Sequence, residues 1–507
     1  MQKSNRNKYS IFNALSAVLL TLVNGVLGIV VTKMIINTYG SDFNGLNSTA
    51  NQIVNVLLIV EGGFTLASNV TLFYPLTKKD YTIVNSILAL TKKKFESIGW
   101  LFLICGIVIS IIYTFMINSR LSNELIFSVI IMTIVPAAFN LYYATTYRVL
   151  LQTQQKEYVI NIITMSTIGL GHLGNILLII CNGPIWLVRA ITMLFALINS
   201  ILIGNYVKKK NKFINLNVSY ENINISGTKD VMAQKITGVI YNSLPIVFIS
   251  MSTTGGTVLA SVYAVYNNIF NMIKSILRGI IDAPRLGIGQ LLTEEKKENV
   301  WFIFAQYEYI VFISIFVTLC TAYILILPFI SIYTEGISDA TYYDFWIAFL
   351  MVLIAVFELI HIPSGHLINM AGKFKIAKNI QIISCVVLLI LMMIGGINFG
   401  IYGLLWAVLI VSILLAFLEI WYVHAVFFEN KINELIRLLV PFLISGFICC
   451  YLETNFFVEI SGVIEFITTG FILTLINSSV AIFISLIFAR KELSYLVKRG
   501  RMLLIKK

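Results

Sequence analysis

Six polar or charged residues recur at helical spacing within an otherwise apolar stretch in the second half of the chain. They are called the polar stripe below and follow one another at steps of four, three, four, four and three: Asn267, Asn271, Lys274, Arg278, Asp282 and Arg285. Such steps place side chains on one face of an α-helix. Ammonium and guanidinium groups donate strongly to phosphate oxygens where water is scarce. The polar stripe therefore predicts a site for an anionic group, and a diphosphate fits it best.

The same residues could instead form a structural ladder of ion pairs. In that interpretation Arg278 and Arg285 neutralise Asp282, and the long side chain of Lys274 extends toward the membrane surface. One carboxylate cannot neutralise three cations, so positive charge is left over. Because ionisable residues inside membrane spans usually serve a function, the excess favours anion binding.

Composition indicates which kind of element carries the stripe. Of the 507 residues, 58% are hydrophobic and 12% are charged, which is too much apolar surface for a soluble protein to bury. The apolar stretches run on the order of 20 residues without strict alternation, which indicates membrane-spanning helices rather than barrel strands. Lys274 falls near the middle of one stretch, where a cation facing lipid costs at least ~3 kcal/mol. It is expected to face a cavity or a partner.

Apolar windows between polar, glycine or proline breaks predict an all-α membrane protein with fourteen transmembrane helices. The polar stripe lies on the eighth. The predicted spans are 11–36, 44–70, 97–117, 125–147, 158–180, 184–206, 232–252, 257–283, 302–329, 343–362, 379–396, 401–426, 436–453 and 464–488.

Basic residues alternate between successive loops. With the N-terminus inside, all but three of the 36 Lys and Arg residues fall in cytoplasmic loops, tails or adjoining helix ends, the exceptions being Lys33, Arg120 and Arg189. This is the positive-inside pattern, so the net charge of +12 does not indicate nucleic acid. Both termini are expected to be cytoplasmic. The basic and leucine-rich run 490–507 is expected to lie on the anionic inner leaflet.

The chain contains a weak internal repeat. A shift of 216 residues places 51–55 on 267–271, so the second and eighth spans resemble copies. A six-span unit repeated in one orientation predicts two six-helix lobes related by a pseudo-two-fold axis along the membrane normal. The expected division is an N-lobe at 1–212, a C-lobe at 213–430, and two extra spans with a basic tail at 431–507.

The repeat predicts that polar residues from both halves line one central cavity. The residues expected to bind the diphosphate there are Lys274, Arg278, Arg285, Lys33 and Arg189. Lys33 and Arg189 could alternatively reach the outer headgroups. The polar residues expected to line the cavity are Asn24, Asn51, Asn55, Asn267, Asn271 and Asp282.

The sequence carries no pattern for catalysis, for a nucleotide or for a metal. Its six cysteines lie in or beside apolar stretches, and its four histidines lack metal-ligand spacing. No cofactor is expected. Glu358 and His361 are one helical turn apart and could relay a proton, although a satisfied pair at a helix end is the simpler interpretation. A coupling ion is possible but has no assigned residue.

Several short motifs, in this order and with fourteen spans, resemble the Wzx-like polysaccharide flippases of the multidrug/oligosaccharidyl-lipid/polysaccharide (MOP) exporter superfamily. They are Asn24-Gly25-Val26-Leu27-Gly28 and the segments 39–47, 74–76, 260–267 and 287–291. One departure is Asn242-Ser243-Leu244, where many relatives have an aspartate after Asn-Thr. The sequence therefore offers no carboxylate for a coupling role at this point.

This resemblance implies a V of two six-helix lobes plus two C-terminal helices, working by alternating access in the bacterial cytoplasmic membrane. The implied substrate is an undecaprenyl-diphosphate-linked oligosaccharide for capsule, O-antigen or a related glycan. The polysaccharide polymerase machinery is a possible partner.

Three alternatives remain open from the sequence. A flippase for the peptidoglycan lipid precursor would share the fold and the cationic stripe. A drug/cation antiporter of the same superfamily would be expected to have twelve spans and a carboxylate-lined cavity. A membrane glycosyltransferase or polysaccharide polymerase would need a constellation of catalytic residues on a large outer loop, and the predicted outer loops are short.

Overall fold

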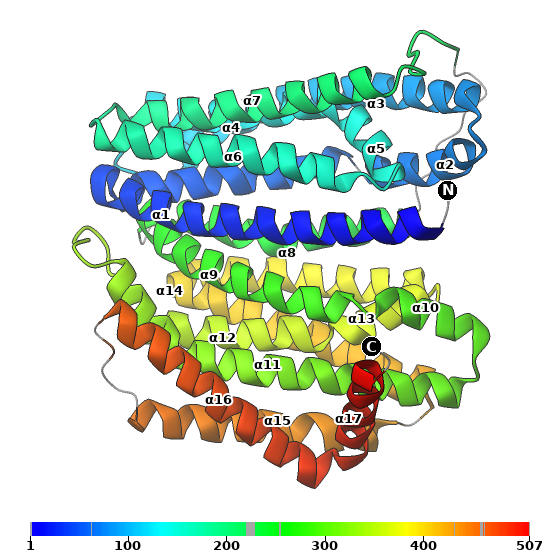
Figure 1. Cartoon of the computed structure of the whole chain (residues 1–507). Coiled ribbons are helices and arrows are strands. Elements are labelled where there is room, and N and C mark those ends of the chain that lie inside the picture. The colour runs from blue at the N-terminus through cyan, green and yellow to red at the C-terminus, as the bar shows by residue number, and fades with distance from the viewer. Residues whose placement is uncertain are drawn as a thin grey trace. The chain divides into compact units, whose positions relative to one another are not determined.

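A computed structural model describes residues 3–61, 63–219, 229–252, 255–429, 431–456, 460 and 462–505. Over these residues the chain forms helices and turns, and no strand occurs in this part. The chain divides into two compact units, Met1–Ala264 and Val265–Lys507. Figure 1 labels the helices along the chain.

The first unit is built from long helices joined by short turns. Its elements are α1 (Lys3–Leu57), η1 (Leu58–Glu61), α2 (Phe64–Lys78), α3 (Tyr81–Met116), α4 (Asn123–Phe139), a π-helical turn η2 (Asn140–Ala144), α5 (Thr145–Thr153), α6 (Glu157–Ile180), α7 (Ile185–Lys210) and α8 (Lys229–Ser250). Within it, α1 packs against α6 and α8, α6 against α7, and α3 against α4. Fully buried side chains such as Phe43, Phe95 and Phe102 fill its core.

The second unit begins within α9 (Gly256–Asp282), which passes from one unit into the other. The elements that follow are α10 (Arg285–Glu294), α11 (Lys297–Tyr333), α12 (Phe345–Ile360), α13 (Ile362–Met370), α14 (Phe374–Trp421), a π-helical turn η3 (Tyr422–Phe427), α15 (Ile432–Phe456), α16 (Val463–Phe488) and α17 (Arg490–Ile505). Here α11 packs against α12, α15 and α16, and α12 against α14.

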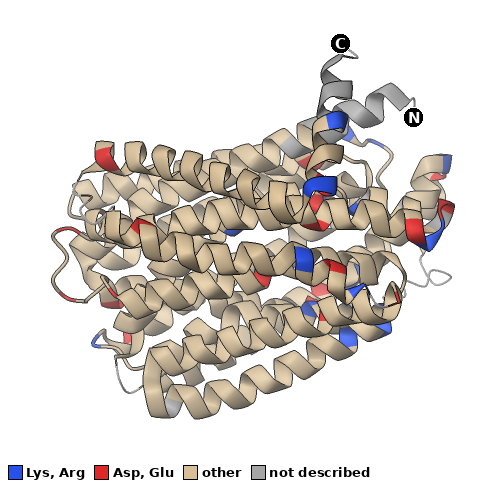
Figure 2. Ribbon diagram, turned by 90° about the horizontal axis from the view of Figure 1, so that it is seen from below, with Lys and Arg blue, Asp and Glu red and all other residues tan. Residues whose placement is uncertain are grey.

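The expected membrane helices are present. In the described part of the chain, eleven helices are long and apolar enough to cross a membrane. One of these, Leu15–Glu61, covers two expected spans because α1 bends at Gly40, whose φ of 87° suits glycine. The more polar helices α8 and α9 lie at the seventh and eighth expected spans. Long stretches of the helices carry no charged residue (Figure 2). The chain is therefore a multi-pass membrane protein with an architecture consistent with fourteen spans.

The start of α9 is fixed inside the first unit by close contact with α1. Asn44 donates from Nδ2 to Ser261 Oγ at 2.7 Å, and Thr257 donates to the carboxylate of Asp42. A Cβ on Gly45 would lie 1.7 Å from the Thr257 carbonyl oxygen, so the two backbones touch only because Gly45 has no side chain. Two segments that the sequence singled out separately therefore meet within the first unit, 39–47 through Asn44 and 260–267 through Ser261.

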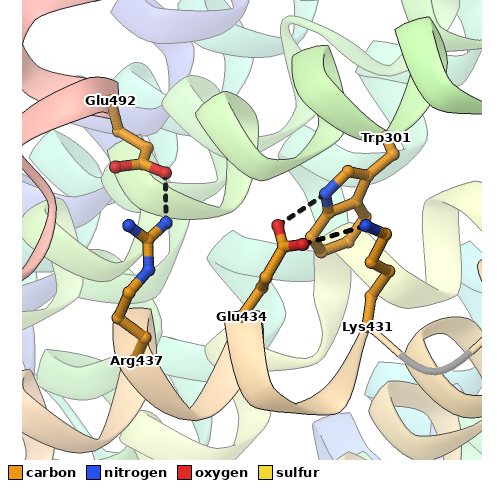
Figure 3. A network of polar contacts seen from close by, with 5 residues as sticks. All are labelled: Trp301, Lys431, Glu434, Arg437 and Glu492. Carbon is orange, nitrogen blue, oxygen red and sulfur yellow. Dashed lines mark hydrogen bonds and ion pairs between the residues drawn. The ribbon is translucent and has the colours of Figure 1, made fainter.

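The C-terminal helices are tied to α11 by polar contacts. Glu434 accepts from Trp301 Nε1 and from Lys431 Nζ, at 2.8 and 2.9 Å. Arg437 pairs with the buried Glu492 at 2.5 Å, which joins α15 to α17 (Figure 3). The segment 490–507, which was expected at the inner membrane surface, is helical from Arg490 to Ile505. Residues 506–507 lie outside the described residues.

Candidate functional site

The polar stripe is centred on α9 in the second unit. Tyr266 anchors this helix by donating from its hydroxyl to the Tyr342 carbonyl at 2.8 Å, and Tyr307 of α11 donates to the Ile281 carbonyl at 2.7 Å. The helix ends at Asp282 because Pro284 cannot donate a backbone hydrogen bond to the preceding turn. Arg285 begins α10. The stripe therefore follows one helical face only as far as Asp282, which corrects the spacing argument for Arg285.

Lys274 has a partner that is distant in the sequence. Its Nζ lies 2.7 Å from Oε2 of Glu358 on α12, and the two side chains are 8% and 10% exposed. The pair satisfies the expectation that an intramembrane lysine faces a cavity or a partner. The carboxylate that neutralises Lys274 is therefore Glu358 on α12, and not Asp282, the carboxylate of the stripe itself.

The rest of the stripe is open. Asn271, Arg278, Asp282 and Arg285 are exposed, and Asn267 is half-buried. Asp282 lies 3.3 Å from His366 Nε2. Among the described residues neither Arg278 nor Arg285 makes an ion pair, so the proposed ladder with Asp282 is not formed. Two guanidinium groups thus remain available on or beside this face.

Two further carboxylates in the second unit face histidines. Glu419 Oε2 lies 2.8 Å from His361 Nδ1, and Glu308 Oε2 lies 3.0 Å from His424 Nε2 in a fully buried pair. The possible relay between Glu358 and His361 is therefore not a direct contact, because each of these residues faces a different helix. Sequence spacing could not show these pairings, since their members are far apart in the chain.

The first unit contains an open cavity of about 430 Å³, whose wall mixes apolar side chains with several polar ones. Its wall includes three residues that the sequence singled out, Asn24, Asn51 and Arg189, together with Arg148 and His172. Asn55, which bonds to Gln52, and the half-buried Lys33 do not line it. Arg148 was missed because its place near the cytoplasmic end of the 125–147 span looked like an ordinary positive-inside charge.

Neutral side chains hold both arginines of this cavity. Arg189 is 5% exposed and donates from Nε to Thr133 Oγ1 at 2.8 Å and from Nη2 to Asn51 Oδ1 at 2.5 Å. Arg148 donates from Nη2 to Asn199 Oδ1 at 2.7 Å. These bonds join α1, α4, α5 and α7.

The second unit contains an apolar cavity of about 440 Å³ between α11, α12 and α15. Phenylalanines supply much of its wall, among them Phe312, Phe316 and Phe349, and Gly446 on α15 keeps it open. A cavity of this kind accepts a hydrocarbon chain but offers little to a polar group.

No protein-family model and no curated protein matches the chain. Solved structures do match its fold. The lipid II flippase MurJ, in an inward closed conformation, aligns with a TM-score of 0.68 and 15% identity over 92% of this chain and 98% of MurJ. An inward-facing multidrug resistance MATE family transporter of the MOP superfamily aligns with a TM-score of 0.65 and 11% identity, over 81% and 97% of the two chains.

The eukaryotic MATE transporter AtDTX14 aligns with a TM-score of 0.55 and 13% identity over 85% of this chain and 98% of the transporter. At these identities the likeness shows the fold alone, which this chain shares with MurJ and the MATE transporters. The proteins that share it here are transporters and flippases, not enzymes.

Proposed function

We propose that this protein flips undecaprenyl-diphosphate-linked oligosaccharide across the bacterial cytoplasmic membrane by alternating access. The observation that carries the proposal is the exposed Arg278 on a membrane helix, next to a buried lysine and without a carboxylate partner among the described residues. A guanidinium in this setting binds phosphate oxygens well. The MOP-type fold supplies a scaffold that is known among transporters.

The sign of the charge separates this function from drug export. A carrier of organic cations needs carboxylates at its binding face, whereas on the polar stripe the cations outnumber the single carboxylate, Asp282. We assign the first contact with the diphosphate to Arg278 and Arg285, which are exposed. Lys274 becomes available when the anion or a proton displaces it from Glu358.

The apolar cavity between α11, α12 and α15 supports a lipid-linked substrate. An anion without a hydrocarbon chain would gain nothing from a wall of phenylalanines, while a polyprenyl chain would bury apolar surface there. The cavity and the stripe belong to the same unit of the chain, so one substrate would need both an anionic head and an apolar tail.

A second candidate is a flippase for the peptidoglycan lipid precursor. The likeness to MurJ, described as a lipid II flippase, favours it. Both substrates present a diphosphate on a polyprenyl chain, so the stripe and the apolar cavity serve either one. The difference lies in the glycan.

Transport by the purified full chain in proteoliposomes tests the proposal. The lipid carries a fluorescent sugar, and a reductant that cannot cross the bilayer quenches only the outer leaflet. We expect the undecaprenyl-diphosphate oligosaccharide to move at least about tenfold faster than in empty liposomes. Faster movement of the peptidoglycan precursor would select the second candidate. Movement of a cationic dye alone, or of none of these compounds, would overturn the assignment.

A further inference from the structure

The cavity of the first unit holds two positive charges without a negative one. Its described lining residues include Arg148 and Arg189 but no aspartate or glutamate. In the second unit, by contrast, the buried Lys274 faces Glu358 and the buried Glu492 faces Arg437. Burying a charge without a counter-charge is unfavourable, so this arrangement indicates that a ligand supplies the missing anion.

The two arginines also have N–H donors that are not used in hydrogen bonds to the protein. A guanidinium has five N–H donors. Arg189 uses Nε and one N–H of Nη2 on neutral oxygens, and Arg148 uses Nη2 on Asn199. The Nε of Arg148 is buried and has no acceptor in the described part of the chain. The unused buried donor of Arg148, together with the N–H groups of Arg189 that these two bonds leave over, matches the several acceptor oxygens of a phosphate group.

The local backbone opens room for such a ligand. Pro136 in α4 lacks the N–H that an α-helix needs, and four residues later the helix widens into the π-helical turn at Asn140. Pro136 and Asn140 both line the cavity. Asn24 and Asn51, which also line it, are exposed, so the cavity is open on their side. An ion could enter there.

The two arginines are spread along the cavity. Asn199, which holds Arg148, follows Arg189 by ten residues on α7, a rise of roughly 15 Å. His172 also lines the cavity, with its Nε2 3.4 Å from Asn24 Oδ1. Each arginine thus presents its own donors, and removing both should cost more binding than removing either one.

We propose that this cavity binds a phosphate-class oxyanion through Arg148 and Arg189, independently of the polar stripe on α9. The ligand is either a free phosphate or diphosphate, or the phosphate head of a lipid. The proposal does not depend on transport, because the arginines and every residue that holds them belong to the first unit. If the protein flips diphosphate lipids, the cavity is a second binding site for the same chemical group.

Calorimetric titration of the purified full chain tests this proposal. The probes are inorganic diphosphate, inorganic phosphate and a short prenyl diphosphate, at constant ionic strength set with chloride. The protein carries Arg278→Gln and Arg285→Gln, which remove the two exposed cations of the stripe. We expect diphosphate binding to persist in this background and to weaken at least about tenfold when Arg148→Gln and Arg189→Gln are added. Tighter binding of the prenyl diphosphate would identify a lipid head as the ligand.

A matched control is Lys208→Gln, which removes a cation from the same helix, α7, outside the cavity wall. It should bind diphosphate like its parent. Equal binding by the protein without Arg148 and Arg189 would overturn the proposal. If that variant does not fold, thermal unfolding of the parent protein with Arg278→Gln and Arg285→Gln is the test. Its thermal unfolding temperature should rise with diphosphate and not with chloride, and no rise would contradict the site.

Discussion

Lys274 on α9 and Glu358 on α12 form a buried ion pair, with 2.7 Å between Nζ and Oε2. The next cation of the stripe, Arg278, is exposed one helical turn away. The pair therefore divides the stripe into a neutralised position and an open one. Under the proposed function, the open arginine meets the anion first, and the lysine joins when its carboxylate partner is displaced.

Removing one member of this pair should destabilise the protein. Lys274→Gln leaves Glu358 buried without its counter-charge, which costs roughly 3–5 kcal/mol of unfolding free energy. The double variant Lys274→Gln/Glu358→Gln removes both charges and should regain most of that loss. Thermal unfolding in detergent compares the three proteins.

The double variant also separates structure from transport. Under the proposed function it folds like wild type but moves the diphosphate lipid at least about tenfold more slowly. A double variant that is as unstable as Lys274→Gln would show that the pair is not the source of the stability. Unchanged transport by a stable double variant would remove Lys274 from the site.

The contact between α1 and α9 should tolerate no side chain at position 45. In Gly45→Ala the new Cβ would lie 1.7 Å from the Thr257 carbonyl oxygen, so one backbone must move. We expect a loss of about 1–3 kcal/mol or more. The control is Gly28→Ala on the same helix, where a Cβ meets nothing within 4 Å. Equal unfolding temperatures for the two variants would contradict the described packing.

Filling the apolar cavity should impair a lipid substrate specifically. A Cβ on Gly446 would lie 3.6 Å from Cys320 Sγ, which is an ordinary contact, so a larger side chain at this position projects into the cavity. We expect Gly446→Phe to slow transfer of the diphosphate lipid while the protein stays folded. Ile444→Phe places the same side chain on the same helix at a position that is 56% exposed, and it should transport normally. Equal rates would exclude the cavity from the transport path.

Membrane orientation can be checked by cysteine labelling in a background without the six native cysteines. The positive-inside pattern places Ser338 outside and Lys209 inside, and both residues are exposed. A reagent that cannot cross the membrane should label Ser338→Cys in intact cells. It should label Lys209→Cys only after the membrane is opened. The reverse result would invert the topology and place both termini outside.

The spans could be predicted from sequence because membrane insertion depends on local hydropathy, a property of neighbouring residues. Bends were harder to recognise. Helix α9 ends before Arg285 because of Pro284. This proline is visible in the sequence and argues against a continuous helix through the stripe. The spacing argument for Arg285 failed at this point.

Partners across helices could not be predicted in the same way. Glu358 lies 84 residues from Lys274, and hydropathy says nothing about which helices pack together. Arg148 was hidden for a different reason, since a basic residue near the inner end of a span is what the positive-inside pattern expects. Only the folded chain brings it to the same cavity as Arg189.

The most direct test of the proposed function compares transfer rates of wild type, Arg278→Gln and Lys297→Gln in proteoliposomes with the diphosphate-linked oligosaccharide. Lys297 is the control because it is an exposed cation of the same unit, paired with Glu429 away from the stripe. Arg278→Lys tests whether charge alone suffices. The account predicts that Arg278→Gln loses at least about tenfold in rate, Arg278→Lys retains part of it, and Lys297→Gln matches wild type. Wild-type rates for a folded, inserted Arg278→Gln protein would contradict it.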